Sequence, residues 1–282
     1  MLLGLSIPTD VGPDFDPAGL AQLAERLGFD FVSSVDHPEG TSPTHETWTM
    51  LTWVAAATSR IKIATRVLGV PYRPPAMVAK MAETFHRLSD GRLILGLGGG
   101  GSDKEFRAFG LGVPTPGEKV DGLAEAVAIV RGLWQERQFS FEGKLYRTEA
   151  ADIEPKPETP IAVWLGTYGP RALRLTGHVA DGWIPSLGYV SEEAIVPLVQ
   201  RVVEAAVAAG RDPDEIERVY NLEVRFDEPA GDPAAVTGSS EEVVERLLRL
   251  AGLGFTGFNF ITGADAAEQA ERLAAEVLPA LR

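Results

Sequence analysis

A run of glycines directly after a short apolar segment is the pattern in this chain that points most strongly to a bound cofactor. Apolar residues 93–97, interrupted only by Gly96, lead into Gly98-Gly99-Gly100-Gly101. Glycine has no Cβ atom, so a flat or phosphorylated group can lie directly against the backbone. A flexible surface loop with glycine turns is the alternative interpretation. No convincing acidic partner follows a second strand about 20 residues on, as a dinucleotide-binding fingerprint requires, which disfavours nicotinamide binding in a Rossmann domain.

A second glycine-containing segment has the composition of an anion-binding helix start. Proline is typical of a first helical position, and the N–H groups exposed there attract phosphate together with the helix dipole. An ordinary helix start with an exposed arginine is the alternative. The predicted phosphate site consists of Gly166, Thr167, Tyr168, Gly169, Pro170 and Arg171.

An acid and an imidazole stand side by side after another apolar run, at Asp36 and His37. Histidine titrates near neutral pH, so His37 is the first candidate for a proton donor or acceptor. Asp36 is the second catalytic candidate, and Glu105 or bound water are alternative proton carriers. A buried structural histidine beside a turn-capping aspartate is the plain alternative.

Composition excludes several classes of function. The 282 residues carry 26 basic and 40 acidic side chains, a net charge of −14, which repels nucleic acid and anionic membrane surfaces. The chain has no cysteine and no histidine pattern typical of a metal site, so we expect no disulfide and no metal. Neither a signal peptide nor a spanning segment is evident, and we expect a cytoplasmic protein. The expected partners are a small-molecule substrate and, if the chain assembles, a second copy in a homodimer.

Eight apolar runs alternate with amphipathic segments and must position these residues. The runs lack strict alternation, as is typical of buried parallel strands. Helix-start signals separate them, and no linker divides the chain. We therefore predict an α/β fold, a single (β/α)8 TIM barrel over residues 1–282, with an open doubly wound sheet as the alternative. The predicted strands cover residues 3–7, 29–35, 61–67, 93–97, 161–165, 182–185, 219–226 and 256–261.

An insertion follows the fourth predicted strand. Residues 139–146 have the pattern of a small hairpin with a turn near Glu142-Gly143, and we expect it to help cover the ligand pocket. In a barrel, the segments that follow the strands share one mouth. Thr9, Trp48, Trp183 and Ser186 are the predicted substrate-wall residues there.

Taken in order, several motifs along nearly the whole chain resemble the bacterial luciferase-like monooxygenase superfamily, which consists of barrel oxidoreductases that use flavin mononucleotide (FMN) or the deazaflavin coenzyme F420. The resemblance favours the F420 branch, with FMN as the alternative cofactor. The motifs are Ser34-Val35-Asp36-His37, Arg73-Pro74-Pro75, Leu95-Gly96-Leu97-Gly98-Gly99-Gly100, Gly169-Pro170-Arg171-Ala172-Leu173, Ala180-Asp181-Gly182-Trp183 and Val277-Leu278-Pro279-Ala280-Leu281.

The resemblance also implies roles for the site residues. Asp36 and a bulge at Arg66-Val67 would flank the cofactor ring, and the bulge would carry a non-prolyl cis peptide. The glycines at 98–100 would receive the cofactor tail, and the segment 166–171 its phosphate. The implied activity is hydride transfer between F420 and a small organic substrate. The alternatives are an FMN-dependent monooxygenase and a non-catalytic cofactor-binding barrel.

One departure from the family concerns the proton donor. In the sugar-phosphate dehydrogenase branch, an acid that assists proton transfer falls where this chain has Gly101. Its loss argues against glucose 6-phosphate as substrate and leaves His37 as the first candidate.

Overall fold

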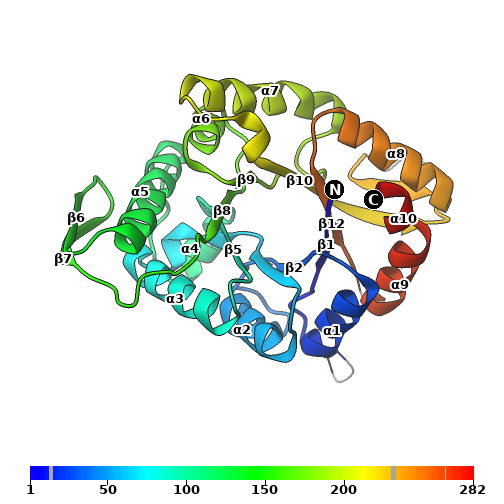
Figure 1. Ribbon diagram of the computed structural model, residues 1–282, viewed down its shortest axis with the longest axis horizontal. Coiled ribbons are helices and arrows are strands. Elements are labelled where there is room, and N and C mark those ends of the chain that lie inside the picture. The colour runs from blue at the N-terminus through cyan, green and yellow to red at the C-terminus, as the bar shows by residue number, and fades with distance from the viewer. Residues whose placement is uncertain (13–14, 230–232, 264) are drawn as a thin grey trace.

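Eight parallel strands form a closed barrel in the computed structural model, which describes residues 1–12, 15–229, 233–263 and 265–282 (Figure 1). Each strand pairs with its neighbour in sequence order, β9 pairs with β10, and β12 pairs with β1 to close the ring. All eight predicted runs overlap a barrel strand, which confirms the TIM barrel and excludes the open sheet. The barrel strands are β1 (Leu2–Ser6), β2 (Phe31–Ser34), β3 (Lys62–Thr65), β5 (Leu93–Gly98), β8 (Ala162–Leu165), β9 (Gly182–Trp183), β10 (Glu217–Phe226) and β12 (Gly257–Ile261).

A ring of helices surrounds the strands and covers their outer faces (Figure 1). Local signals set the helix starts: Asp16 caps α1 ahead of a proline, and Ser239 and Glu242 form a capping box at α8. No helix among the described residues is long and apolar enough to cross a membrane. The principal helices are α1 (Pro17–Leu27), α2 (Thr47–Ala57), α3 (Pro75–Leu88), α5 (Pro116–Gln135), α6 (Pro170–Val179), α7 (Glu192–Ala208), α8 (Ser240–Gly252) and α9 (Ala266–Glu276).

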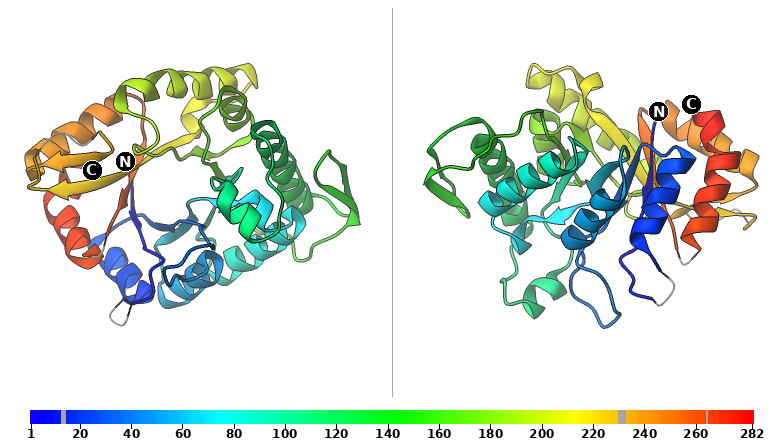
Figure 2. Two further views of the ribbon diagram at one scale, coloured as in Figure 1. Left: turned by 180° about the vertical axis from the view of Figure 1, so that it is seen from behind. Right: turned by 60° about the horizontal axis from the view of Figure 1, so that its bottom comes forward.

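Short elements supplement this frame. After β3, the chain forms β4 (Leu68–Gly69) and the 3-10 turn η1 (Val70–Tyr72), and α4 (Asp103–Ala108) follows β5. The remaining ones are η2 (Pro213–Glu215), β11 (Ala235–Gly238), which pairs with β10, and α10 (Leu278–Leu281). The two chain ends lie at one end of the barrel, and α4 projects from the other (Figure 2).

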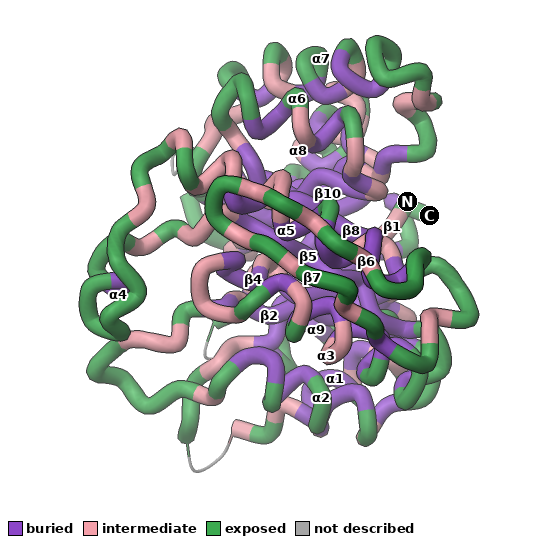
Figure 3. The backbone as a smooth tube through the Cα atoms, turned by 90° about the vertical axis from the view of Figure 1, so that its left-hand side faces the viewer, coloured by how far each residue is buried: buried purple, intermediate pink, exposed green. Residues whose placement is uncertain are grey.

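The core has two layers, and the buried strands occupy the centre of the molecule (Figure 3). The larger layer lies between strands and helices, whereas the smaller one fills the barrel interior around Phe31 and Trp164, whose rings meet edge to face at 5.5 Å. A Cβ atom on Gly4 would lie 2.1 Å from the Phe31 ring, so glycine is required there. Nearer the carboxyl ends of the strands, Ser33 donates to Asn259, which donates to Asn221. This buried polar chain joins β2, β12 and β10.

The insertion forms the predicted hairpin but does not cover the mouth. Strands β6 (Phe139–Glu142) and β7 (Arg147–Ala151) pair antiparallel outside α5 (Figure 1). Its turn is held to α5 because Glu125 accepts hydrogen bonds from the N–H groups of three turn residues, 144–146. The expectation that the hairpin covers the pocket was wrong, because this carboxylate fixes it to the outer helix face.

Candidate functional site at the carboxyl end of the barrel

A cavity of about 480 Å³ lies at the mouth of the barrel, where segments from six of the strands converge. Its floor includes Asn221, a member of the buried polar chain, and Tyr189 contributes to its rim with 78% exposure. The cavity is lined by Val35, Asp36, His37, Arg66, Val67, Gly69, Tyr72, Gly98, Gly99, Gly100, Gly101, Ser102, Gly166, Tyr168, Ile184, Ser186, Tyr189 and Asn221.

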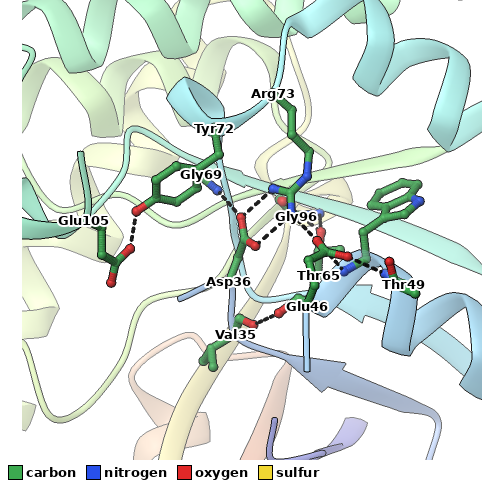
Figure 4. A network of polar contacts seen from close by, with 12 residues as sticks. Val35, Asp36, Glu46, Thr49, Thr65, Gly69, Tyr72, Arg73, Gly96 and Glu105 are labelled. Atoms are coloured by element: carbon green, nitrogen blue, oxygen red, sulfur yellow. Dashed lines mark hydrogen bonds and ion pairs between the residues drawn. The ribbon is translucent and has the colours of Figure 1, made fainter. Parts of the chain in front are cut away.

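Asp36 is buried and fully engaged by its neighbours (Figure 4). Its Oδ2 accepts hydrogen bonds from the Gly69 N–H at 3.0 Å and from Nη1 of Arg73 at 2.7 Å, while Oδ1 accepts from Nη2 at 3.0 Å. Arg73 also donates to Glu46, the residue that caps α2. Although burial acts in the opposite direction, hydrogen bonds and the charges of the two carboxylates raise the pKa of Arg73. This network fastens η1 to the end of β2 and shapes one side of the cavity.

His37, Glu105 and Tyr72 form a second polar cluster beside the first. The Glu105 carboxylate, which is almost completely buried, accepts from Nδ1 of His37 at 2.9 Å and from the Tyr72 hydroxyl. Burial and the bond to Glu105 raise the pKa of Tyr72, so the phenol keeps its proton. A carboxylate only accepts hydrogen bonds, so His37 donates from Nδ1 and its Nε2 is free for proton exchange. The His37 side chain is 53% exposed, which gives it access to a substrate.

The glycine run forms a packed wall of the cavity. A Cβ atom on Gly98 would lie 2.6 Å from the Val67 side chain, and one on Gly166 would lie 3.1 Å from it. Gly100 has a φ of +87°, and a Cβ atom there would meet the Phe106 ring at 2.2 Å. The run is therefore not a free surface loop. The peptide bond between Arg66 and Val67 is cis, as predicted.

The predicted phosphate residues separate into three environments. Gly166 and Tyr168 line the cavity, whereas Thr167 is buried and its hydroxyl bonds to Thr176. Gly169, Pro170 and Arg171 are exposed at the start of α6, where Gly169 provides no side-chain cap. The Arg171 guanidinium pairs with Asp121 on α5. The N–H groups at this helix start are thus open at the edge of the site.

Of the four predicted substrate-wall residues, only Ser186 lines the cavity. Thr9 lies outside it, where its carbonyl accepts from the His45 N–H. Trp48 packs edge to face on Phe85 between α2 and α3, because α2 is largely apolar and buries this side chain against its neighbouring helix. Trp183 is fully buried on the outer side of the barrel, in the layer between strands and helices. These three predictions are corrected by the structure.

The sequence of the chain decides the family. Residues 16–232 match the profile of the family described as luciferase-like monooxygenase. The chain belongs to this family. Nothing in the fold conflicts with that membership, and the cavity of this luciferase-like protein lies where barrel enzymes hold their ligands.

Among named relatives of this luciferase-like chain is the F420-dependent glucose-6-phosphate dehydrogenase of Kineococcus radiotolerans. The two are 34% identical over 230 residues, which cover 78% of this chain and 66% of the relative. This chain therefore spans just under two thirds of the relative's length.

Two solved structures share the fold of this luciferase-like protein at low identity. An F420-dependent secondary alcohol dehydrogenase in complex with an F420-acetone adduct has a TM-score of 0.88 at 20% identity, covering 99% of this chain and 98% of its own. The coenzyme F420-dependent tetrahydromethanopterin reductase of Methanopyrus kandleri has a TM-score of 0.84 at 21% identity, covering 99% of both chains.

Several site residues of this luciferase-like protein were not assigned from its sequence: Tyr72, Arg73, Tyr189 and Asn221. Glu105 was named only as an alternative proton carrier. Arg73 is part of a quoted motif, but nothing in that motif indicates its partner, Asp36, which lies 37 residues earlier. Such pairs become visible only when the strands close into a barrel.

Proposed function

We propose that this protein is an oxidoreductase that transfers a hydride between coenzyme F420 and a small organic substrate, with residues 1–282 acting as one domain. The observation that carries the proposal is the cavity itself, in which a smooth glycine wall and a half-exposed histidine face the same space. Family membership supports the reaction class, and relatives named as F420-dependent support the choice of cofactor.

The residues present fit such a cofactor. The half-buried Val67 side chain packs on Gly98 and Gly166 and lines the cavity, so a planar ring can lie against the bulge there. We assign the ring to the bulge and the Asp36 side of the cavity, and the tail to the glycines at 98–100. The phosphate is assigned to the segment 166–171, where the open start of α6 supplies N–H groups and Arg171 a positive charge.

The chain's own residues then perform the acid–base part of the reaction. The bound deazaflavin supplies the hydride chemistry. His37 exchanges the substrate proton at Nε2, while Glu105 holds the imidazole through Nδ1 and compensates its positive charge after protonation. Asp36 acts as a positioning residue, because Arg73 and the Gly69 N–H occupy its oxygens.

Titration of the purified protein with F420 and with FMN tests the cofactor assignment. We expect a saturable change in deazaflavin fluorescence with F420 and weaker binding of FMN. Reduction of F420 in the presence of a panel of alcohols, or oxidation of reduced F420 by a panel of carbonyl compounds, then tests turnover. Tighter binding of FMN would contradict the cofactor assignment, and F420 binding without turnover of any compound would favour a carrier protein. Light scattering tests the further proposal of a homodimer.

A further inference from the structure

Arg66 is a cation without a charged partner at the floor of the cavity. Its backbone follows β3, and its side chain crosses the barrel interior to the end of β1, where Nη2 donates to the Ser6 hydroxyl at 3.0 Å. The Nε atom is buried and has no hydrogen-bond partner. Of the described residues that line the cavity, Arg66 is the only arginine, and none is a lysine.

The surroundings of Arg66 are costly for a positive charge. Burial lowers the pKa of Arg66 to about 10, and the guanidinium therefore remains charged at neutral pH. No carboxylate of a described residue lies within 4.0 Å of it, whereas Arg73 pairs with Asp36 and Arg171 pairs with Asp121. Charges withdrawn from water in proteins are normally paired. Arg66 is half-buried with a buried Nε atom, has no charged partner and lines a cavity, which indicates an anionic ligand.

The direction of the side chain separates this charge from the wall assigned to the cofactor ring. Val67 packs toward the glycine wall at Gly98 and Gly166. Arg66, its neighbour in the chain, extends instead toward Ser6 and lines the cavity together with Tyr168 and Tyr189. The two residues of this dipeptide therefore face different parts of the cavity, Val67 the glycine wall and Arg66 the end of β1.

We propose that Arg66 binds a carboxylate of the substrate, which makes the substrate a small organic acid. A single guanidinium matches a planar monoanion through two parallel hydrogen bonds. A phosphate dianion normally requires additional cations or a helix N-terminus; no lysine or second arginine lines the cavity, and the open start of α6 is the place assigned to the cofactor phosphate. The assignment names the substrate class of the proposed function and rests on it for the occupant of the glycine wall.

Calorimetry with benzoate and its neutral isostere benzamide tests the assignment, with and without saturating F420. We expect benzoate to bind at least tenfold more tightly than benzamide in both states. Arg66→Met should abolish that preference, Arg66→Lys should keep part of it, and inorganic phosphate should bind less well than benzoate. Arg147→Met, which removes an equal charge from the exposed hairpin, is the matched control and should leave the preference intact.

A parallel fluorescence titration identifies the source of the anion. We expect Arg66→Met to change the F420 dissociation constant by less than threefold. A tenfold weaker F420 affinity without any benzoate preference in the wild type would assign Arg66 to the cofactor and overturn the proposal. Tighter binding of phosphate than of benzoate would also overturn it. Failure of F420 to bind at all would refute the proposed function, and the cofactor-free benzoate comparison would still test Arg66.

Discussion

Arg66 lines the cavity and Arg73 pairs with Asp36, one of the other lining residues, and the two arginines differ in what satisfies their charge. Arg73 meets two carboxylates and joins η1 to β2 and α2, whereas Arg66 meets a single hydroxyl. A buried cation with a complete set of partners holds the protein together, because its loss leaves an uncompensated carboxylate. A buried cation without charged partners contributes little to stability and is available for a ligand. The contrast distinguishes Arg73, whose charge stabilises the fold, from Arg66, whose charge is available to a ligand.

The largest expected effect on stability is that of Arg73→Met. Removing one partner of a buried ion pair costs about 3–5 kcal/mol, because the remaining charge stays buried. Asp36 would keep only the Gly69 N–H. Urea denaturation should therefore give a free energy of unfolding lower by that amount.

Arg66→Met is the matched variant for that comparison. Replacing a half-buried, unpaired charge by an apolar side chain of similar length should leave the free energy of unfolding unchanged or raise it by about 1 kcal/mol. Equal destabilisation by both substitutions would remove the distinction between the two arginines.

His37→Ala tests the functional side of the comparison at a second residue. The side chain is half exposed, and Glu105 keeps its hydrogen bond from the Tyr72 hydroxyl, so stability should change less than in Arg73→Met. If His37 moves the proton, turnover at saturating cofactor should fall by roughly 10²–10⁴-fold with F420 affinity retained. Normal turnover in the folded variant would eliminate this role.

Gly169→Val sharpens the comparison at the open start of α6. A Cβ atom on Gly169 has no protein atom within 4 Å, so the fold should accept the larger side chain. A phosphate bound there would be displaced, and F420 affinity should fall at least tenfold, about 1.4 kcal/mol. Gly252→Val, at an equally open position at the end of α8, is the control and should bind F420 normally.

The smallest expected effect on stability is that of Glu46, the second carboxylate that Arg73 contacts. Although burial acts in the opposite direction, hydrogen bonds from Thr49, Trp48 and Arg73 lower its pKa below the ordinary value of 4.5. A carboxylate with a lowered pKa stabilises the folded state above its unfolded-state pKa and loses that contribution as the pH falls through the folded value. Glu46→Gln should therefore show a shallower loss of stability than the wild type on acidification below pH 4.5. If the stabilities of the wild type and of Glu46→Gln fell in parallel with pH, Glu46 would make no such contribution to stability.

The barrel could be predicted from the sequence because buried parallel strands are continuous apolar runs separated by helix-start signals. Which residues of each strand face the helices and which face the barrel interior could not be predicted. In β9 and the residue after it, Trp183 faces the helices and Ile184 lines the cavity, and a strand of two residues gives no alternation from which to choose. The helix position of Trp48 was equally ambiguous.

The candidate site was predictable only where its residues are neighbours in the chain. The glycine run and the Asp36-His37 pair were found in this way, the Arg66-Val67 bulge was implied by the family resemblance, and the structure brings all three to one cavity. Glu105 reaches His37 from α4, 68 residues further along the chain, and its partnership depends on how β5 and its following loop sit beside β2. No pattern of neighbouring residues in the sequence indicates this contact between His37 and Glu105.

The buried chain from Ser33 through Asn259 to Asn221 has a consequence for protein engineering. Asn259 is fully buried and is not among the residues that line the cavity, yet its amide holds Asn221, which forms part of the floor. A library that varies only the cavity walls would leave Asn221 in its present orientation. Randomising position 259 together with the floor residue gives access to cavity shapes that single wall substitutions do not reach.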